Sequence, residues 1–190
     1  MRALEQKILQ EGVVLPGNIL KVGSFLNHQI DTDFILDIGH EIANIYRDEK
    51  VTKILTIEAS GIAIGMGVGV AMHLPLVFAK KNKHANISGD VYKTRVHSYT
   101  HDTEYTVVLS KEFLGAEDRV VIVDDFLANG KALMGLIDIV NQSKATLVGC
   151  SCVIEKGFQG GGDALRKMGV RVESLAIIES MDNDVVTFRR

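Results

Sequence analysis

Short runs of branched apolar residues alternate with stretches of helical periodicity along nearly the whole chain, and this alternation constrains the fold most strongly. The runs predict strands, and the apolar spacing of three or four residues between them predicts helices. Strand–helix alternation of this kind indicates an α/β fold, with a mostly parallel sheet flanked by helices. The expected strands cover 51–57, 74–79, 91–99, 105–109, 119–123, 145–154 and 170–177, and the expected helices cover 3–11, 31–47, 62–73 and 131–142.

Composition narrows the class of protein. The chain has 190 residues, of which 46% are hydrophobic, so we expect a single domain over 1–190 with a sizeable core. A net charge of -3 argues against a protein whose main task is to hold nucleic acid. The N-terminus lacks an apolar signal segment, and the apolar stretch 61–74 is too short and too rich in glycine for a membrane span. Cys150 and Cys152 would share one buried strand face, which fits a reducing, cytoplasmic setting.

Ligands of parallel α/β sheets bind beyond the carboxyl ends of the strands, so binding residues are expected at those positions. The richest segment follows the apolar run 120–123, where Asp124 and Asp125 precede a loop of small residues and a helix. Backbone N–H groups at a helix start attract phosphate, and glycine allows close approach. Two acids beside an anion site would face sugar hydroxyls or phosphate-bound Mg²⁺. The segment therefore predicts a cradle for a phosphorylated sugar.

Two other interpretations of this segment were weighed. The acid pair alone could simply end a strand and cap a turn, but the strand, loop and helix around it favour a binding role. The dipeptide Gly130-Lys131 could belong to a Walker phosphate loop. That motif needs a glycine five residues before Gly130, where this chain has Asp125, so we exclude it.

The four apolar residues, the two acids and the small-residue loop resemble the phosphoribosyl pyrophosphate motif of type I phosphoribosyltransferases. The resemblance implies the type I phosphoribosyltransferase fold and a pentosyltransferase activity. It implies that Asp124 and Asp125 are catalytic residues that face the ribose. It also implies that the 5′-phosphate is held by Ala128, Asn129, Gly130, Lys131 and Ala132. The family usually has Thr-Gly or Ser-Gly after the acids, so the amide of Asn129 must replace a hydroxyl.

A second turn resembles the pyrophosphate loop of the same family. It follows the first expected strand and leads into a glycine-containing helix, and it implies pyrophosphate binding by Ala59, Ser60 and Gly61. Lys80 and Lys81 follow the next strand and would meet the same pyrophosphate, although a solvated basic turn is the other interpretation. The polar stretch 82–93 matches the mobile lid of the family. The glycines at 65, 67 and 69 are expected to allow close helix packing.

The segments outside the core resemble those of bacterial xanthine-type members of the family. In that family the terminal segments, here about 1–30 and 155–190, fold over the site as a hood. The resemblance implies that xanthine is bound by Leu20, Asn27, Lys156 and Phe158. Lys156 donates hydrogen bonds only, and Asn27 donates and accepts, so the two suit the carbonyls of xanthine. Spacing alone favours a surface lysine at 156 and a turn asparagine at 27, and the resemblance reverses this.

The remaining expectations also come from the resemblance. Phosphoribosyl pyrophosphate is the sugar donor, Mg²⁺ is held mainly by its oxygens, and the protein forms a homodimer. The histidine spacing suggests no metal site within the protein. Another purine, namely guanine, hypoxanthine or adenine, remains an alternative substrate. A regulator that senses phosphoribosyl pyrophosphate is the competing class, but it would need a DNA-binding domain or a basic face.

Overall fold

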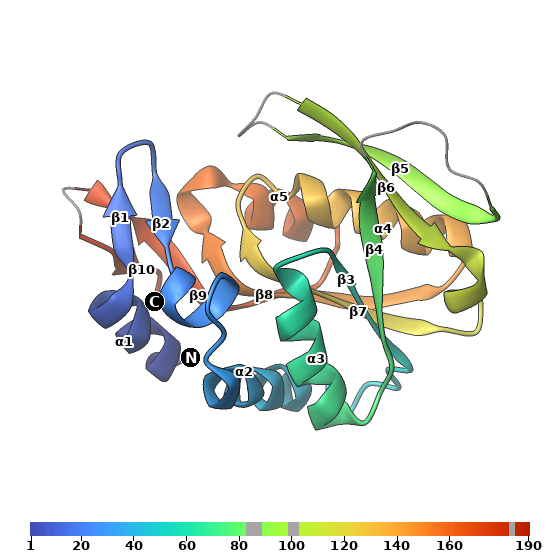
Figure 1. Ribbon diagram of the computed structural model, residues 1–190, viewed down its shortest axis with the longest axis horizontal. Helices are drawn as coiled ribbons and strands as arrows, with labels where there is room; N and C mark the ends of the chain where they lie inside the picture. The colour runs from blue at the N-terminus through green and yellow to red at the C-terminus, as the bar shows by residue number, and fades with distance from the viewer. Residues whose placement is uncertain (83–88, 99–102, 183–184) are drawn as a thin grey trace.

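The computed structural model describes residues 1–82, 89–98, 103–182 and 185–190. Within these residues an eight-stranded sheet runs through the molecule in the order β10-β9-β8-β7-β3-β4-β6-β5 (Figure 1). Its strands are β3 (Lys53–Ile57), β4 (Leu76–Asn82), β5 (Val91–Ser98), β6 (Thr103–Ser110), β7 (Arg119–Leu127), β8 (Thr146–Lys156), β9 (Val172–Ser180) and β10 (Thr187–Phe188).

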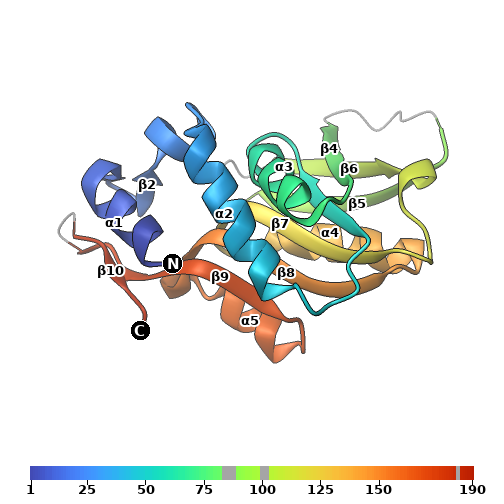
Figure 2. The same cartoon turned by 90° about the horizontal axis from the view of Figure 1, so that it is seen from below.

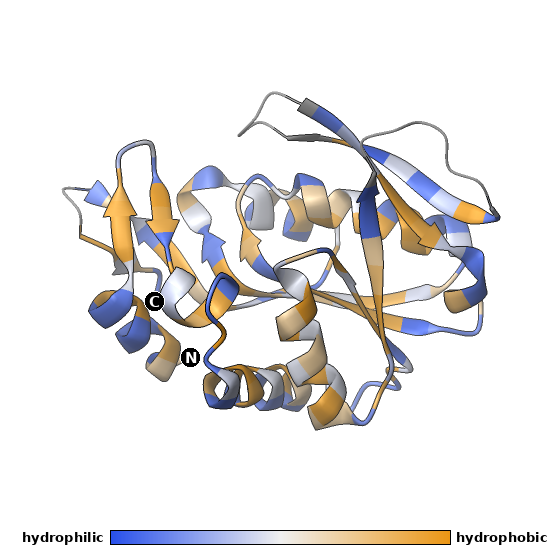
Figure 3. Ribbon diagram, in the orientation of Figure 1, coloured by the Kyte–Doolittle hydropathy of each residue, from blue (hydrophilic) through white to orange (hydrophobic). Residues whose placement is uncertain are grey.

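The centre of the sheet is parallel, as the alternating pattern predicts. The five strands β9, β8, β7, β3 and β4 pair in parallel, so their carboxyl ends lie along one edge. Antiparallel strands extend the sheet on both sides, with β6 and β5 next to β4 and β10 next to β9. Apolar colouring follows the central strands, which are buried between helices (Figure 3).

Helices cover both faces of the sheet (Figure 2). On one face α2 (Thr32–Ile45) and α3 (Gly61–Met72) pack in one apolar cluster with alternate residues of β7. On the other face α4 (Lys131–Ser143) and Leu165 of α5 (Gly161–Lys167) form the second cluster. Cys150 and Cys152 are fully buried in this second cluster, which confirms their expected shared face. The α/β fold class is therefore confirmed.

The glycines of α3 allow close packing, as predicted. A side chain on Gly39 of α2 would place its Cβ 2.4 Å from the backbone of Gly67, so the two helices cross at backbone contact. Gly65 and Gly69 similarly lie against Leu76 and Leu74. A nucleotide-binding role is not needed to explain these glycines.

The N-terminal segment forms a small layer of its own at the β10 end of the sheet. It consists of α1 (Arg2–Glu11), β1 (Val13–Leu15), β2 (Ile19–Lys21) and a π-helix, η1 (Gly23–Asn27). The antiparallel β1–β2 hairpin is a separate two-stranded sheet. The amino group of Met1 donates a hydrogen bond to the carbonyl of Leu175 in β9, which attaches α1 to the central sheet. In the C-terminal part of the expected hood, 155–190, the strands β9 and β10 both belong to the eight-stranded sheet.

Two short 3₁₀ helices complete the described elements, η2 (Lys111–Phe113) and η3 (Gly157–Gln159). No helix among the described residues has the length and apolar character needed to cross a bilayer.

Candidate functional site

The acid pair lies inside a strand and not at its end, which corrects the sequence analysis. The strand β7 continues past Val123 to Leu127, because Asp124 still pairs with Cys152 and Leu127 with Glu155 of β8. Asp124 and Asp125 are buried, with 5% and 7% of their surface exposed. The connection from β7 to α4 therefore begins at Ala128.

The five residues expected at the 5′-phosphate form the tight connection from β7 to α4. Gly130 caps α4 with φ of 81°, a left-handed conformation that favours glycine. The side-chain Oδ1 of Asn129 accepts a hydrogen bond from the backbone N–H of Lys131 at 3.2 Å. Because the carbonyl end is turned to the backbone, the NH₂ end of this amide is the donor left for an anion. The loop and the helix start enclose a small hollow of about 90 Å³, which Asp124 also lines.

The two carboxylates interact with each other and with the N-terminal layer. The Oδ1 of Asp124 accepts a hydrogen bond from the backbone N–H of Asp125 at 3.0 Å. The Nδ2 of Asn27 donates to Oδ2 of Asp125 at 3.0 Å, across 98 positions of sequence. Burial, and then the neighbouring Asp125 carboxylate, raise the pKa of Asp124 well above its usual range. The pair is thus a buried acidic site in which the pKa of one carboxyl lies above its ordinary value.

The turn expected to bind pyrophosphate starts beside this pair. A cis peptide bond joins Glu58 to Ala59, and α3 begins at Gly61. A Cβ atom on Gly61 would lie 2.0 Å from Oγ1 of Thr56 and 3.1 Å from Oδ1 of Asp124. The Oγ1 of Thr56 donates to the carbonyl of Val123 at 2.7 Å, which ties β3 to β7 at this point. The turn and the acid pair therefore share one edge of the sheet.

Lys80 and Lys81 lie within β4 and not in a turn after it, which is a second correction. The strand continues to Asn82 because β6 pairs with it, as Lys80 does with Val108. The backbone N–H of Lys81 donates to Oε1 of Glu58 at 2.7 Å. The ammonium group of Lys81 is near enough to Asp124 to oppose, in part, the rise in the pKa of that carboxyl. Half of the expected lid 82–93, namely residues 83–88, lies outside the described residues.

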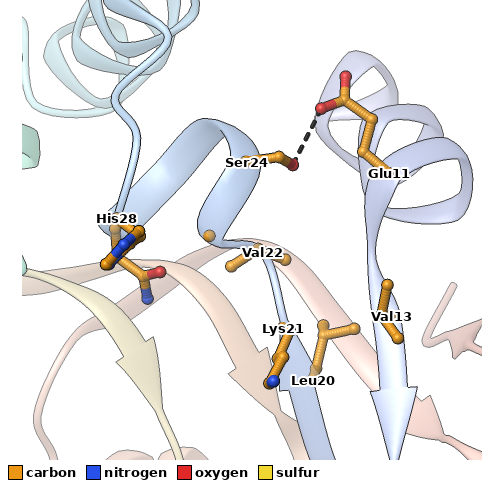
Figure 4. A pocket seen from close by; sticks show the side chains of 9 residues that line it. Glu11, Val13, Leu20, Lys21, Val22, Ser24 and His28 are labelled. Carbon is orange, nitrogen blue, oxygen red and sulfur yellow. Dashed lines mark hydrogen bonds between the residues drawn. The ribbon is translucent and has the colours of Figure 1, made fainter.

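The residues expected at the base are distributed over two places. Leu20 and Asn27 line a recess of about 600 Å³ in the N-terminal layer, with Ser24 hydrogen-bonded to Glu11 at 3.0 Å on its wall (Figure 4). Lys156 and Phe158 are not among the residues that line it. Leu20 is largely buried, with 6% of its surface exposed.

Lys156 lies instead over the ring of Phe126, with its Nζ 5.6 Å from the ring centroid. Its Nζ donates to the carbonyl of Asn18 in the β1–β2 turn at 2.8 Å, so the end of β8 contacts the N-terminal hairpin. Burial lowers the pKa of Lys156. Phe158 lies in η3 with 38% of its surface exposed.

Sequence reasoning missed three residues that the structure brings to this edge. Phe126 belongs to the quoted motif but received no role, although its place directly after the acids could have signalled one. Thr56 and Glu155 are buried polar residues in strands that read as apolar. Since their partners are distant in sequence, no local pattern could have identified them.

This arrangement agrees with the comparison to known proteins. Residues 27–185 match the model of the phosphoribosyl transferase domain family. The match includes the acid pair, the loop before α4 and the turn before α3, and it covers most of the chain. The chain therefore belongs to the phosphoribosyltransferase family.

The relatives are more specific. A protein named xanthine phosphoribosyltransferase from Lachnoclostridium phytofermentans is 52% identical over 191 residues, which cover 100% of this chain and 98% of the relative. A protein of the same name from Clostridioides difficile is 53% identical over 190 residues, which cover 100% of both chains. The likeness extends over the whole length, including the N-terminal layer.

Solved structures support the fold. The adenine phosphoribosyltransferase of Giardia lamblia, complexed with 9-deazaadenine, matches with a TM-score of 0.77 and 21% identity, covering 93% of this chain and 98% of that one. The enzyme from Thermoanaerobacter pseudethanolicus matches with a TM-score of 0.73 and 19% identity, covering 92% and 98%. At this identity the likeness shows the fold alone.

Proposed function

We propose that this protein transfers the 5-phosphoribosyl group from phosphoribosyl pyrophosphate to N9 of xanthine, giving xanthosine monophosphate and pyrophosphate. The observation that carries the proposal is the full-length identity of about half to proteins named for this reaction. The buried acid pair beside the glycine-containing loop before α4 supplies the chemistry that the reaction needs. The reaction belongs to purine salvage, which favours a cytoplasmic location.

In the proposed reaction the bond between C1′ and the pyrophosphate oxygen breaks, and the electron pair leaves with pyrophosphate. The bond between N9 and C1′ forms, and the N9 proton passes to solvent. Charge that develops on the ribose is positive, so a buried carboxylate beside it stabilises it more than water would. Asp125 has this role, and Asp124 holds the ribose hydroxyls beside it. The loop Ala128–Ala132 fixes the 5′-phosphate, which orients the sugar for displacement.

The turn before α3 is assigned to the leaving group. Backbone amides of Ala59, Ser60 and Gly61 bind pyrophosphate, and Lys80 and Lys81 neutralise its charge from β4. Gly61 and Lys81 lie near Asp124, which supports this placement, because the pyrophosphate and the ribose must share one substrate.

Mg²⁺ fits this site as an ion carried by the sugar donor. Among the described residues, none form a group of three or more His, Cys, Asp or Glu side chains that could cage a metal. The acid pair and the donor's own oxygens are the hard ligands that Mg²⁺ prefers. Asp124 and Asp125 would hold it with the ribose hydroxyls, and it would neutralise charge on the leaving pyrophosphate.

We assign the base to the place where Lys156, lying over Phe126, and Asn27 of the N-terminal layer reach the sheet edge. Lys156 and Asn27 offer donors to the xanthine carbonyls, and Leu20 and Phe158 supply apolar contacts. Both polar side chains already connect the N-terminal layer to the sheet, Lys156 through Asn18 and Asn27 through Asp125. A purine with an amine at C2 or C6 would place a donor against one of these donors, which costs affinity.

A homodimer belongs to the same proposal. Met66 and Val70 of α3 expose 60% and 54% of their surface, and Phe78 of β4 exposes 38%. Large apolar side chains that are this exposed favour burial in an interface. Sedimentation should give about twice the 20.8 kDa mass of one chain, and a single-chain mass would exclude the dimer.

The proposal is tested by offering each purine separately. The protein is incubated with phosphoribosyl pyrophosphate, Mg²⁺ and xanthine, guanine, hypoxanthine or adenine, and nucleotide formation is followed by ultraviolet absorbance and chromatography. We expect xanthine to have the highest kcat/KM. A higher kcat/KM for another purine would reassign the base, and formation of no nucleotide would exclude the enzyme.

A further inference from the structure

The short helix α5 lies directly against the loop that we assign to the 5′-phosphate. The backbone N–H of Gly161 donates to the carbonyl of Ala128 at 3.2 Å. A Cβ atom on Gly161 would lie 2.3 Å from that carbonyl oxygen and 2.6 Å from the backbone nitrogen of Gly130. The start of α5 and the loop therefore touch backbone to backbone, and a side chain at 161 would have to push them apart.

An ion pair between α5 and β8 holds α5 in this position. Arg166 donates from Nη1 to Oε1 of Glu155 at 2.9 Å and from Nη2 to Oε2 at 2.7 Å. Glu155 is fully buried on β8, and Ser174 of β9 donates a further hydrogen bond to its Oε2 at 2.5 Å. A bidentate pair of this kind fixes both distance and orientation.

The strand register also places Glu155 next to the loop before α4. It pairs with Leu127, the last residue of β7 before the phosphate loop. A Cβ atom on Gly162 would lie 2.1 Å from Oε1 of Glu155, so the second glycine of α5 is needed for the helix to reach this carboxylate. Consecutive glycines thus let α5 contact the loop on one side and Glu155 on the other.

We infer that the Glu155–Arg166 pair, acting through Gly161, is a positioning device for the 5′-phosphate loop. Neither side chain contacts the substrate. Arg166 sets the position of α5, α5 sets the position of Ala128 and Gly130, and these set the geometry of the sugar donor. The inference rests on the proposed function, since it assigns the loop to the 5′-phosphate.

Lys156, which we assign to the base, is held by contacts other than the Glu155–Arg166 pair. Lys156 lies in β8, and the ladder to β9 pairs it with Ile178. Loss of the ion pair should therefore loosen the phosphate loop and leave Lys156 in place. The device predicts an effect on the sugar donor and none on the purine.

The test compares steady-state kinetics of wild type, Arg166→Met, Arg166→Lys and Gly161→Ala. We expect the KM for phosphoribosyl pyrophosphate to rise at least fivefold in Arg166→Met and Gly161→Ala, while the KM for xanthine changes less than twofold. Arg166→Lys should give an intermediate value, because a lysine keeps the charge but not the bidentate geometry. Calorimetric titration with ribose 5-phosphate should show the same order of affinities.

Arg171→Met and Gly115→Ala are the matched controls. Arg171 directly precedes β9, at the amino end of the parallel strands, and forms ion pairs with Glu49 and Glu173. A Cβ atom on Gly115 would meet nothing within 4 Å. Both should keep the wild-type KM values even if their melting temperature falls. The inference is overturned if Arg166→Met and Gly161→Ala lose only thermal stability, or if both KM values rise equally. A wild type that makes no nucleotide and binds no ribose 5-phosphate would instead overturn the proposed function.

Discussion

Asp124 is a carboxylate that folding removes from water. It is buried beside a second carboxylate, and both facts disfavour its charged form, which raises its pKa. The nearby cation of Lys81 opposes this only in part, as the direction of the shift shows. A residue held this way costs stability, as residues of functional sites commonly do.

The raised pKa of Asp124 predicts a specific dependence of stability on pH. Above the ordinary pKa of the unfolded chain, the unfolded state binds fewer protons at this site than the folded state, so the free energy of unfolding falls as pH rises. The substitution Asp124→Asn removes this fall in the free energy of unfolding, because an amide does not titrate. We expect the variant to gain stability relative to wild type as pH increases from 4 to 7, measured by urea unfolding.

Asp138→Asn is the control for this experiment, because Asp138 is an exposed carboxylate on α4. Its stability relative to wild type should change little over the same range. An Asp124→Asn variant that loses stability as pH rises would contradict the assigned direction.

Asp125 is predicted to matter for rate and not only for binding. Asp125→Asn keeps the shape of the side chain and removes the charge that we place near the developing positive ribose. We expect kcat to fall more than tenfold, which corresponds to about 1.4 kcal/mol or more in activation free energy. Steady-state assays at saturating substrates measure this effect, and an unchanged kcat would refute the assignment.

Single residues of the site were predictable where a local motif carried them. Asp124, Asp125 and Gly130 stand in one continuous segment whose strand, loop and helix are all visible in the sequence. Glu155 and Thr56 were not predictable, because their hydrogen-bond partners come from other strands. Lys156 was predicted to act at the base, but its contact with Asn18 depends on a hairpin that the pattern did not reveal.

At the scale of elements, the sequence places the centres of strands better than their ends. The apolar run 120–123 predicts a strand, but neighbouring ladders extend it through both acids to Leu127. The same applies to β4, which β6 extends through Lys80 and Lys81. Polar side chains at the carboxyl edge look like loop residues in sequence, although hydrogen bonds to adjacent strands hold their backbone.

The start of α3 is an element boundary that should tolerate no side chain. Gly61→Ala would bring a methyl group to 2.0 Å from Oγ1 of Thr56, so α3 or the Thr56–Val123 contact must shift. We expect a loss of about 1–3 kcal/mol in the free energy of unfolding, typical of overpacking. Turnover should also fall, because the same shift moves the turn assigned to pyrophosphate.

Chemical denaturation and kinetics of Gly61→Ala measure these two effects. Gly115→Ala serves as the control, since a Cβ atom there meets nothing within 4 Å. If Gly61→Ala unfolds and turns over like wild type, the turn is not held as the structure indicates.

At the scale of the whole molecule, the N-terminal layer and the sheet edge meet across the candidate site. Asn27 reaches Asp125, and Lys156 reaches Asn18, so the two sides contact each other at both polar residues expected at the base. The parallel sheet was predictable because strand–helix alternation leaves few topologies. The placement of the N-terminal layer was not, since it depends on contacts with β9, more than a hundred residues away.

The central claim is that the edge formed by Asp124–Ala132 and the turn before α3 binds a phosphorylated sugar. Calorimetric titration of the wild-type protein with phosphoribosyl pyrophosphate tests it directly, with and without Mg²⁺. We predict one binding site per chain, with affinity that increases when Mg²⁺ is present. If no heat of binding is detected in the presence of Mg²⁺, the assignment of this edge is contradicted.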